Sequence, residues 1–294
     1  MLKTRQLAFF FALSLLLPLN PPFTSVIQAA EAHMPYAHQT LIVENAQQLL
    51  NAIGSNRTII LKPNTYLLDK AANNIKNPHV IYDRDTGGPV IQNVHNLKLI
   101  GSDVRASKLV ISSEFPNVLS FKNSSAIHIR SLEIGHVPQS AAICLGAVLA
   151  FENSHSIELT DLNLFGSGTF GLWLENSHHL TLSNSVIKEC SQGIAFLSQS
   201  THVLMKNSIF VNNTGGLNLW DASEARLSGI TMAHNQAELS QDYNKALFYA
   251  QGKSRIHVAG SVIQYNSGSR LSETKDSQIV FQRNYMNYNR YLKP

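Results

Sequence analysis

The 294-residue chain contains little charge and very little cysteine. Asp, Glu, Lys and Arg make up 14% of the residues, against about 25% in a typical soluble domain. Two cysteines are too few for a disulfide scaffold. The net charge is only +4 and basic residues do not form runs, which argues against nucleic acid as a partner, because such a protein needs a patch that neutralises phosphates. An apolar fraction of 44% excludes a disordered chain.

The N-terminus has the three parts of a secretory signal peptide. Lys3 and Arg5 precede an apolar stretch over residues 7–17, and Ala30-Glu31-Ala32 has the small-x-small form of a cleavage site. Farther along, nothing approaches the roughly 18 continuous apolar residues that a membrane span needs. We therefore predict that residues 1–32 are a signal peptide, and that the mature protein is secreted or periplasmic without a stable membrane span.

The strongest pattern is an internal repeat. The segment Asn153-Ser154-His155-Ser156-Ile157 returns 23 residues later as Asn176-Ser177-His178-His179-Leu180. Similar turns recur with spacings between 22 and 31 residues. Their first residues are Asn93, Asn123, Asn153, Asn176, Gln199, Asp221, Gly252 and Lys275.

Apolar residues follow each turn at fixed distances and alternate with polar ones, which is the period of a half-buried strand. Leu159, Leu182 and Met205, for example, each stand six residues after a turn. Three short strands per repeat describe one coil of a solenoid, and the coils must stack because none can bury its inner face alone. We predict that residues 33–294 form one all-β solenoid domain of about 8–10 coils, with these three side chains in one stack. A leucine-rich repeat would instead need apolar residues where Ser154, Ser177 and Ser200 stand.

Asparagines recur at one further turn. They stand fourteen residues after the last four reference positions, and Asn tolerates the positive φ of turns. Stacked amides can also hydrogen-bond to one another along the stack. We predict an asparagine ladder formed by Asn213, Asn235, Asn266 and Asn289.

An amphipathic helix precedes the first strand-like segment. Ala46, Leu49, Leu50 and Ile53 follow a helical spacing within residues 44–53. This helix is expected to cap the otherwise open first coil.

Taken together, these features resemble the right-handed parallel β-helix of pectin-lyase-like proteins. The capping helix followed by residues 58–66, Thr-Ile-Ile-Leu-Lys-Pro-Asn-Thr-Tyr, resembles that family's opening, although Asn64 stands where Gly is usual. The repeated Asn-Ser-x-x-apolar-x-apolar turns resemble its coils, and the resemblance runs from about Leu41 to Tyr291. It implies a single-stranded right-handed parallel β-helix. It does not imply one activity, because the superfamily includes lyases, hydrolases, epimerases, accessory proteins and adhesins.

Known catalytic signatures of that superfamily are absent from the sequence. The chain has neither the Gly-His-Gly and paired aspartates of polygalacturonase-like hydrolases nor the Asp-Pro-His-Asp motif of alginate-epimerase-like proteins. Catalytic residues therefore cannot be carried over from the resemblance.

Longer coils indicate where a site could lie. Insertions are predicted around Arg105–Phe115, Gly135–Ala147 and Gln236–Lys245, with a polar loop at Lys70–Gly88. The coils of residues 153–234 are short. Insertions at one corner would stand as walls around a trough over the short coils, and solenoids often carry functional groups on such a face.

Outward positions on the short coils carry candidate sugar-binding groups. Trp173 and Trp220 could stack on sugar rings, and Asn218 could bond to hydroxyls. A polysaccharide or oligosaccharide is therefore the predicted partner. The alternative is that each Trp packs beneath an insertion.

Carboxylates on neighbouring coils are the candidate catalytic groups. Glu152 and Glu175 would be about 5 Å apart, a separation that suits a retaining glycosidase. They could instead bind Ca²⁺ for an acidic polysaccharide, or form a surface stripe in which Lys122 partly balances Glu152. Lys188 and Glu189 are predicted near the trough floor as base or ligand, or as ordinary solvated turn residues.

Histidines form a second constellation. His155, His178 and His202 could converge on stacked coils as Zn²⁺ or Cu²⁺ ligands, although turn packing explains the pattern equally simply. Cys144 and Cys190 lie two coils apart, beyond the reach of a disulfide. We predict free, buried thiols.

The sequence favours an exported β-helix protein that binds or processes a polysaccharide, as a lyase or glycoside hydrolase if it is an enzyme. The alternatives are a non-catalytic surface or periplasmic scaffold with adhesin-like binding, and a metal-accessory protein. No cofactor is established by the sequence, and Ca²⁺ is the candidate.

Overall fold

A computed structural model describes residues 37–138, 145–166, 168–240 and 243–291. The predicted signal peptide, residues 1–32, and Cys144 lie outside these ranges. No helix among the described residues is long and apolar enough to cross a membrane.

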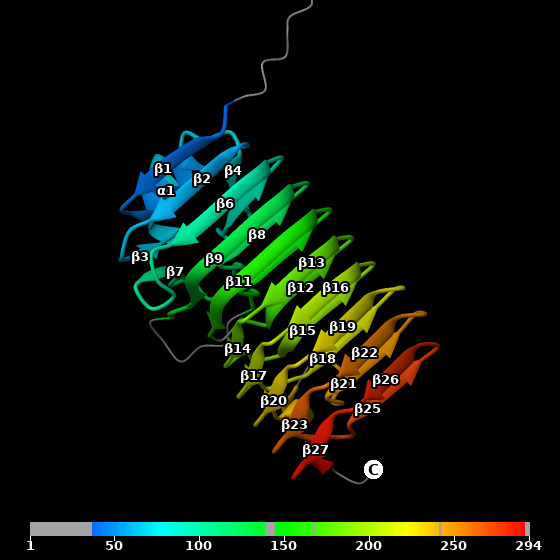
Figure 1. The fold of residues 1–294 in the computed structure, drawn as a ribbon. Helices are drawn as coiled ribbons and strands as arrows, with labels where there is room; N and C mark the ends of the chain where they lie inside the picture. Colours follow the sequence, from blue (N-terminus) through cyan, green and yellow to red (C-terminus); the bar gives the residue numbers. More distant parts are fainter. Residues whose placement is uncertain (1–36, 139–144, 167, 241–242, 292–294) are drawn as a thin grey trace, which may run out of the picture. The chain divides into compact units, whose positions relative to one another are not determined.

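Parallel strands from successive coils make up the first face of the fold (Figure 1). Each strand pairs with the strand one coil away, so the row continues through the whole described domain. Its strands are β1 (Gln39–Val43), β2 (Arg57–Leu61), β6 (His95–Gly101), β9 (Ser125–His136), β11 (His155–Phe165), β13 (His178–Ser183), β16 (Thr201–Lys206), β19 (Glu224–Ser228), β22 (Arg255–Ala259) and β26 (Gln278–Gln282). The row agrees with the predicted eight to ten coils.

The second face belongs to the same 17-stranded sheet, because β9 and β11 bend and contribute to both faces. Its other strands are β3 (Asn64–Leu67), β7 (Ser107–Ile111), β14 (Val186–Lys188), β17 (Ile209–Val211), β20 (Thr231–Ala233), β23 (Val262–Gln264) and β27 (Tyr285–Asn287).

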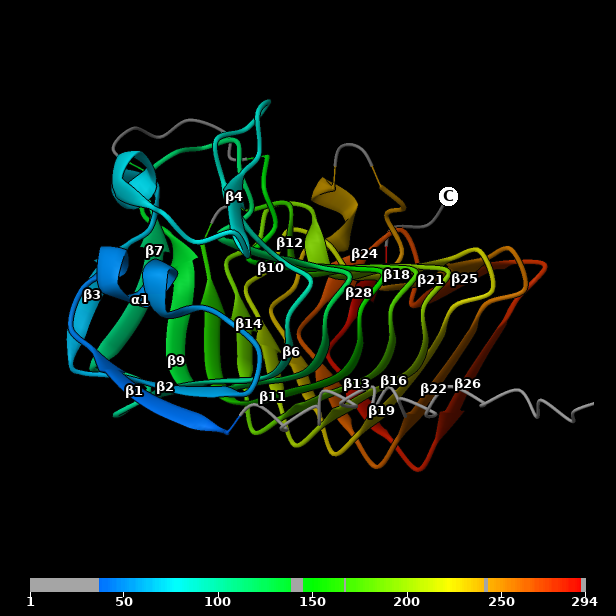
Figure 2. The same ribbon diagram turned by 90° about the horizontal axis from the view of Figure 1, so that it is seen from above.

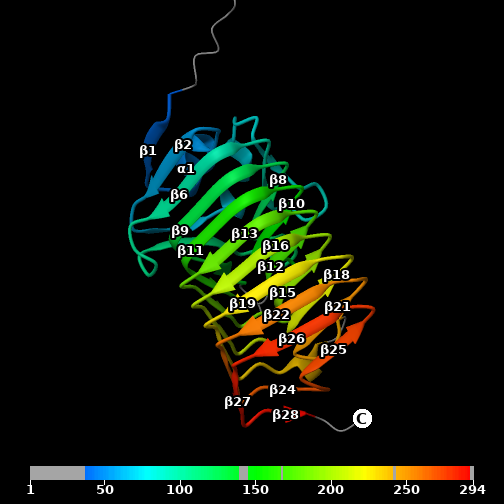
Figure 3. The same ribbon diagram turned by 45° about the vertical axis from the view of Figure 1, so that its right-hand side comes forward.

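The third face is a separate nine-stranded sheet. It comprises β4 (Val80–Tyr82), β5 (Pro89–Gln92), β8 (Leu119–Lys122), β10 (Leu149–Glu152), β12 (Phe170–Glu175), β15 (Gly193–Ser198), β18 (Leu217–Trp220), β21 (Phe248–Gln251) and β25 (Ser272–Lys275). Only β4 pairs in the antiparallel sense, with β5. A short parallel pair, β24 (Ser267–Gly268) and β28 (Arg290–Tyr291), lies at the C-terminal end (Figure 3). Three stacked strands per coil confirm the predicted parallel β-helix.

Like side chains stack in the interior, as the repeat predicted. Leu159 pairs in register with Leu182, and Leu182 with Met205, and all three are fully buried. Phe121 and Phe151 stack one coil apart, with ring centroids 5.2 Å apart and planes 9° from parallel.

Residues with left-handed backbone mark the corners between the faces. The predicted reference turns coincide with one such row, for example Asn153 at φ 49° and Asn176 at φ 45°. The last turn is an exception, because Asp276 takes the positive φ in place of Lys275. Seryl oxygens also form a ladder that the sequence analysis did not predict: the backbone N–H of Ser154 donates to Ser177 Oγ of the next coil, at 3.1 Å.

The predicted asparagine ladder is confirmed. Asn213 Nδ2 donates to Asn235 Oδ1 at 2.9 Å, Asn235 to Asn266 at 2.8 Å, and Asn266 to Asn289 at 3.0 Å. Positive φ is not the reason for asparagine here, because the left-handed residues are the preceding ones, such as Asn212 and His234. The amides are needed for their hydrogen bonds.

The N-terminal end is capped by helix α1 (Ala46–Ala52), within the predicted range of residues 44–53. Asn45 is its N-cap, and its side chain accepts a hydrogen bond from the Gln48 N–H. Ala46, Leu49 and Leu50 are buried against the first coil, as predicted. Two short 3₁₀ helices, η1 (Asp69–Asn74) and η2 (Ala237–Leu239), lie in the connections.

Cys190 is a free, buried thiol, as predicted. Burial raises its pKa, and the nearby Glu189 carboxylate acts in the same direction.

Candidate functional site

The long connections lie at one corner of the coil, where the second face leads into the third. They are residues 68–79 with η1, residues 112–118, residues 137–138 and 145–148 between β9 and β10, and residues 234–240 and 243–247, with η2, between β20 and β21. Figure 2 shows β4 on the side of β10 and β12, away from β13 and β16. The predicted walls therefore exist at one corner. The predicted insertion Arg105–Phe115 is partly wrong, because it includes strand β7.

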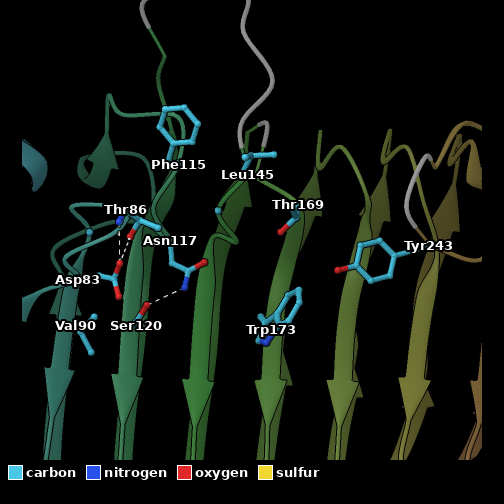
Figure 4. A pocket seen from close by; sticks show the side chains of 12 residues that line it. Asp83, Thr86, Val90, Phe115, Asn117, Ser120, Leu145, Thr169, Trp173 and Tyr243 are labelled. Atoms are coloured by element: carbon cyan, nitrogen blue, oxygen red, sulfur yellow. Dashed lines mark hydrogen bonds between the residues drawn. The ribbon is translucent and has the colours of Figure 1, made fainter.

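A pocket of about 370 Å³ lies between these walls, over the outer side of the third face (Figure 4). The hairpin of β4 and β5, the wall at 112–118 and the wall before β10 surround one part of it, and Trp173 of β12 and Tyr243 line the other. Its polar lining residues are Asp83, Thr86, Asn117, Ser120, Thr169 and Tyr243. Its apolar side chains are Val90, Phe115, Leu145 and Trp173.

One glycine allows two walls of the pocket to touch. A Cβ on Gly146 would stand 1.8 Å from the carbonyl oxygen of Pro116. Any larger residue would therefore push the two segments apart and change the contour of the pocket.

Hydrogen bonds fix two polar groups of the pocket, Asn117 in the wall at 112–118 and Ser120 on β8. Asn117 Oδ1 accepts from the Ala147 N–H at 2.7 Å, and Asn117 Nδ2 donates to Ser120 Oγ at 3.0 Å. The Ser120 oxygen is therefore an acceptor in this bond, which leaves its hydroxyl hydrogen able to donate to a ligand.

The Asp83 carboxylate organises the hairpin turn at the edge of the pocket. Its Oδ1 accepts from the backbone N–H groups of Asp85 at 3.1 Å and Thr86 at 2.8 Å, and from Thr86 Oγ1 at 2.9 Å. These bonds, chiefly those from Thr86, lower the pKa of Asp83, with a smaller contribution from the positive charge of Lys122. The pocket therefore contains a carboxylate that is ionised at neutral pH.

Trp173 belongs to an aromatic cluster on the outside of the third face. It stacks on Phe196, with centroids 4.4 Å apart, and contacts Phe170 edge-on at 5.9 Å. Tyr243, from the segment after η2, lies against both Phe170 and Phe196. Trp173 thus packs beside an insertion and also lines the pocket. Its surroundings therefore combine the two alternatives that the sequence left open, an outward-facing ring and a ring packed against an insertion.

The other two predicted sugar-binding residues lie elsewhere. Asn218 is completely buried, and neither its Oδ1 nor its Nδ2 has a hydrogen-bond partner within the described part of the chain. Trp220 packs against Phe196 at 5.8 Å and Tyr249 at 6.2 Å. Neither lines the pocket. Of the three expected outward side chains, Asn218 is buried, whereas Trp220 is half-buried like Trp173 but lies outside this pocket.

The two predicted catalytic glutamates are neighbours, as expected, but they lie outside the pocket. Glu152 and Glu175 are in register on β10 and β12. Glu152 forms an ion pair with Lys122 at 2.8 Å, and both side chains are more than 40% exposed. This is the charge-balanced surface stripe that the sequence allowed as an alternative.

Lys188 and Glu189 are separated from the trough. Lys188 ends β14, which belongs to the second face, and its Nζ lies 3.5 Å from Glu189 Oε1. It lines a different pocket, together with Asp161 and Asn163. The predicted position of Lys188 and Glu189 near the trough floor is wrong. Alternation of apolar and polar residues shows which side chains point outward, but not which of the three faces their strand belongs to.

The histidines gather at one corner in two pairs. His155 and His178 are in register on adjacent coils. His202 stands beside His179 instead, with ring centroids 4.5 Å apart. His178 Nδ1 accepts from the Thr201 N–H at 3.3 Å. Desolvation lowers the pKa of His178, and the neighbouring histidines add to this.

A preformed metal centre is not seen among the residues that the structure describes, since no three His, Cys, Asp or Glu side chains there are placed to hold an ion. The predicted set of His155, His178 and His202 stays a prediction, as does a Ca²⁺ site at Glu152 and Glu175.

Most of the pocket residues were not singled out from the sequence. Tyr243 and Phe115 lie in predicted insertions, and Asp83 with Thr86 lies in the predicted polar loop. The signal that could have found the last two is the run Asp-Arg-Asp-Thr-Gly-Gly over residues 83–88, which is typical of a side-chain-stabilised turn.

Comparison of the fold with solved structures identifies a right-handed, pectin-lyase-like β-helix. Pectin methylesterase from carrot aligns with a TM-score of 0.56 at 9% identity, over 86% of this chain and 88% of that one. Pectin methylesterase from Aspergillus niger aligns with 0.56 at 12%, over 88% and 91%. ORF18 of Geobacillus virus E2 aligns with 0.50 at 11% and covers 81% of this chain, which spans only 57% of that protein. At these identities the likeness shows the fold alone.

Residues 107–292 match the family model described as "Periplasmic copper-binding protein (NosD)". The match covers more than half of the chain, so the protein belongs to the NosD family. The periplasmic family confirms the predicted secreted or periplasmic location. No curated protein sequence matches the chain.

Proposed function

We propose that the protein binds an oligosaccharide segment in the pocket over β8, β10 and β12. The observation that carries the proposal is that the half-buried ring of Trp173 lines the same pocket as fixed hydroxyl and amide groups. Aromatic rings pack against the apolar faces of sugars, and fixed polar groups orient their hydroxyls.

The size and chemistry of the pocket support this proposal. Its volume of about 370 Å³ lies in the range of small-molecule sites, about 300–1,000 Å³. Phe115 and Leu145, each 56% exposed, stand on the walls. Thr169 offers a hydroxyl near the end that holds Trp173, and Ser120 offers one near the end that holds Asp83 (Figure 4). A chain of sugar rings presents the same mixture of apolar faces and hydroxyl edges.

Binding without turnover is the form of this function that the geometry favours. A glycosidase needs two carboxyl groups on either side of the bond that breaks. Glu152 and Glu175 do not line the pocket, and Glu152 is neutralised by Lys122. Asp83 is the only Asp or Glu among the described lining residues.

Replacing Trp173 by alanine is expected to weaken oligosaccharide binding by about thirtyfold or more, because truncating an aromatic anchor costs about 2 kcal/mol or more. Isothermal titration calorimetry with neutral, amino and acidic oligosaccharides measures this. Tyr265→Ala is the matched control, since it removes a 47% exposed aromatic side chain from another part of the coil. Equal affinities of the two variants would contradict the proposal, and so would the absence of binding to every sugar.

Metal handling is the second candidate function, and membership of a family described as copper-binding favours it. Imidazoles suit Cu²⁺ and Zn²⁺. His155 with His178, and His179 with His202, offer pairs of imidazoles at one corner. These pairs fit an ion held at the surface, but the described residues do not form a three-ligand site.

The double variant His155→Ala/His178→Ala is expected to lose one equivalent of bound Cu²⁺ if this corner holds the ion. Metal analysis after equilibrium dialysis against Cu²⁺ or Zn²⁺ measures the stoichiometry. His95→Ala is the control, because His95 occupies the same turn position without a histidine neighbour in register. Identical metal content in wild type and double variant would remove this candidate.

A further inference from the structure

We propose that the pocket accepts sugars without a carboxylate, and that Asp83 is the residue that excludes acidic sugars. The inference rests on the proposed function and names the substrate class of the same site. It runs against the acidic polysaccharide that the glutamate stripe suggested from the sequence.

The charge of the pocket carries the argument. Among its described lining residues, Asp83 is the only charged one. The internal segments outside the described ranges, residues 139–144, 167 and 241–242, contain no Lys or Arg. A site for a uronate normally supplies a cation, above all an Arg that binds the carboxylate with two hydrogen bonds. This pocket presents a carboxylate instead.

Nearby cations do not cancel that charge. Lys122 acts on Asp83 from a distance, but its ammonium group is held by Glu152 at 2.8 Å. Arg84 and Lys245 are exposed and are not among the lining residues.

One oxygen of Asp83 is left for the ligand. Oδ1 holds the hairpin turn through its three hydrogen bonds, while Oδ2 receives no hydrogen bond from the described part of the chain. Figure 4 shows Asp83 and Ser120 toward one end of the pocket and Trp173 and Tyr243 toward the other. A sugar stacked on Trp173 would therefore extend hydroxyl or ammonium donors toward a fixed carboxylate acceptor. A sugar carboxylate in that place would meet a like charge without compensation.

The sharpest test compares sugars that differ only in charge. Oligogalacturonate, oligomannuronate and a glucuronate-containing oligosaccharide are each titrated before and after their carboxyl groups are reduced to primary alcohols. For each sugar that binds, the reduced form is expected to bind roughly tenfold to a hundredfold more tightly than the acidic form. This is the scale of a like-charge contact in a partly solvated site. The preference should shrink in high salt, because screening weakens it.

In the Asp83→Asn variant, the affinities for the acidic and the reduced form of one sugar are expected to lie within about threefold of each other. The amide oxygen can still accept the turn hydrogen bonds, so the hairpin is retained. Asp85→Asn makes the same charge change in the same turn, outside the lining residues, and should keep most of the preference.

The outcomes separate the two proposals. Acidic forms that bind as tightly as their reduced partners, or a preference that survives in Asp83→Asn, would overturn the role of Asp83 and leave oligosaccharide binding intact. Absence of binding to all the acidic and reduced forms, together with the neutral and amino sugars above, would overturn the binding function itself.

Discussion

Replacing Asn235 by alanine is expected to lower the free energy of unfolding by about 3–5 kcal/mol. The side chain is fully buried and makes four hydrogen bonds. Its Nδ2 donates to Asn266 Oδ1 and to the Phe210 carbonyl, and its Oδ1 accepts from the backbone and side chain of Asn213. Alanine would leave buried polar partners on both neighbouring coils unsatisfied. Urea denaturation followed by circular dichroism measures the loss.

Asn289→Ala is the graded control, because Asn289 ends the same ladder. It accepts from the backbone and side chain of Asn266 and donates to the Ile263 carbonyl, but it is not fully buried. Water can replace part of what it loses, so about half the effect is expected. Equal losses at the two positions, or a loss below about 1 kcal/mol at Asn235, would mean that the ladder does not stabilise the coils as described.

Leu182→Ala is expected to lower the free energy of unfolding by about 2–5 kcal/mol, through lost apolar contact and the cavity that remains. Leu182 is fully buried between Leu159 and Met205 of the adjoining coils. The measurement is again a urea transition.

Leu204→Ala deletes the same atoms on the next strand, β16, from a side chain that is only half-buried and faces outward. A loss below about 1 kcal/mol is expected there. If the two substitutions lowered the free energy of unfolding equally, the assignment of an inner and an outer side to these strands would be wrong.

The fold could be predicted from the sequence because every coil repeats the same physical requirement. Leu180 and Leu182 alternate with polar residues, and their counterparts recur one coil away, which fixes strands, register and interior together. The ladder of Asn213 and its successors could be predicted for the same reason. The helix at 46–52 followed from its own apolar spacing.

The site was harder to predict because its residues do not repeat. Alternation places Trp173 and Asn218 on an outer side, but it cannot tell that Asn218 is covered. Tyr243 reaches the cluster around Trp173 from an insertion far along the chain, and no local pattern encodes that contact.

The spacing of the repeat also does not show how side chains are arranged at the turns between the faces. His202 is one residue farther along its turn than His178, so it stands beside His179, and Thr201 takes the place beside His178. A shift of one position along a turn therefore redirects a side chain without disturbing the apolar rows. Lys188 was placed near the trough for a different reason, because alternation does not show which of the three faces a strand belongs to.

The walls of the pocket come from connections at a single corner, whereas its floor is part of the stacked strands. The backbone N–H and C=O groups of the floor form their hydrogen bonds with strands of the adjoining coils, whatever the length of those connections. Natural variation can therefore lengthen, shorten or exchange the connections and so change the shape of the pocket, while the inherited scaffold beneath keeps its register.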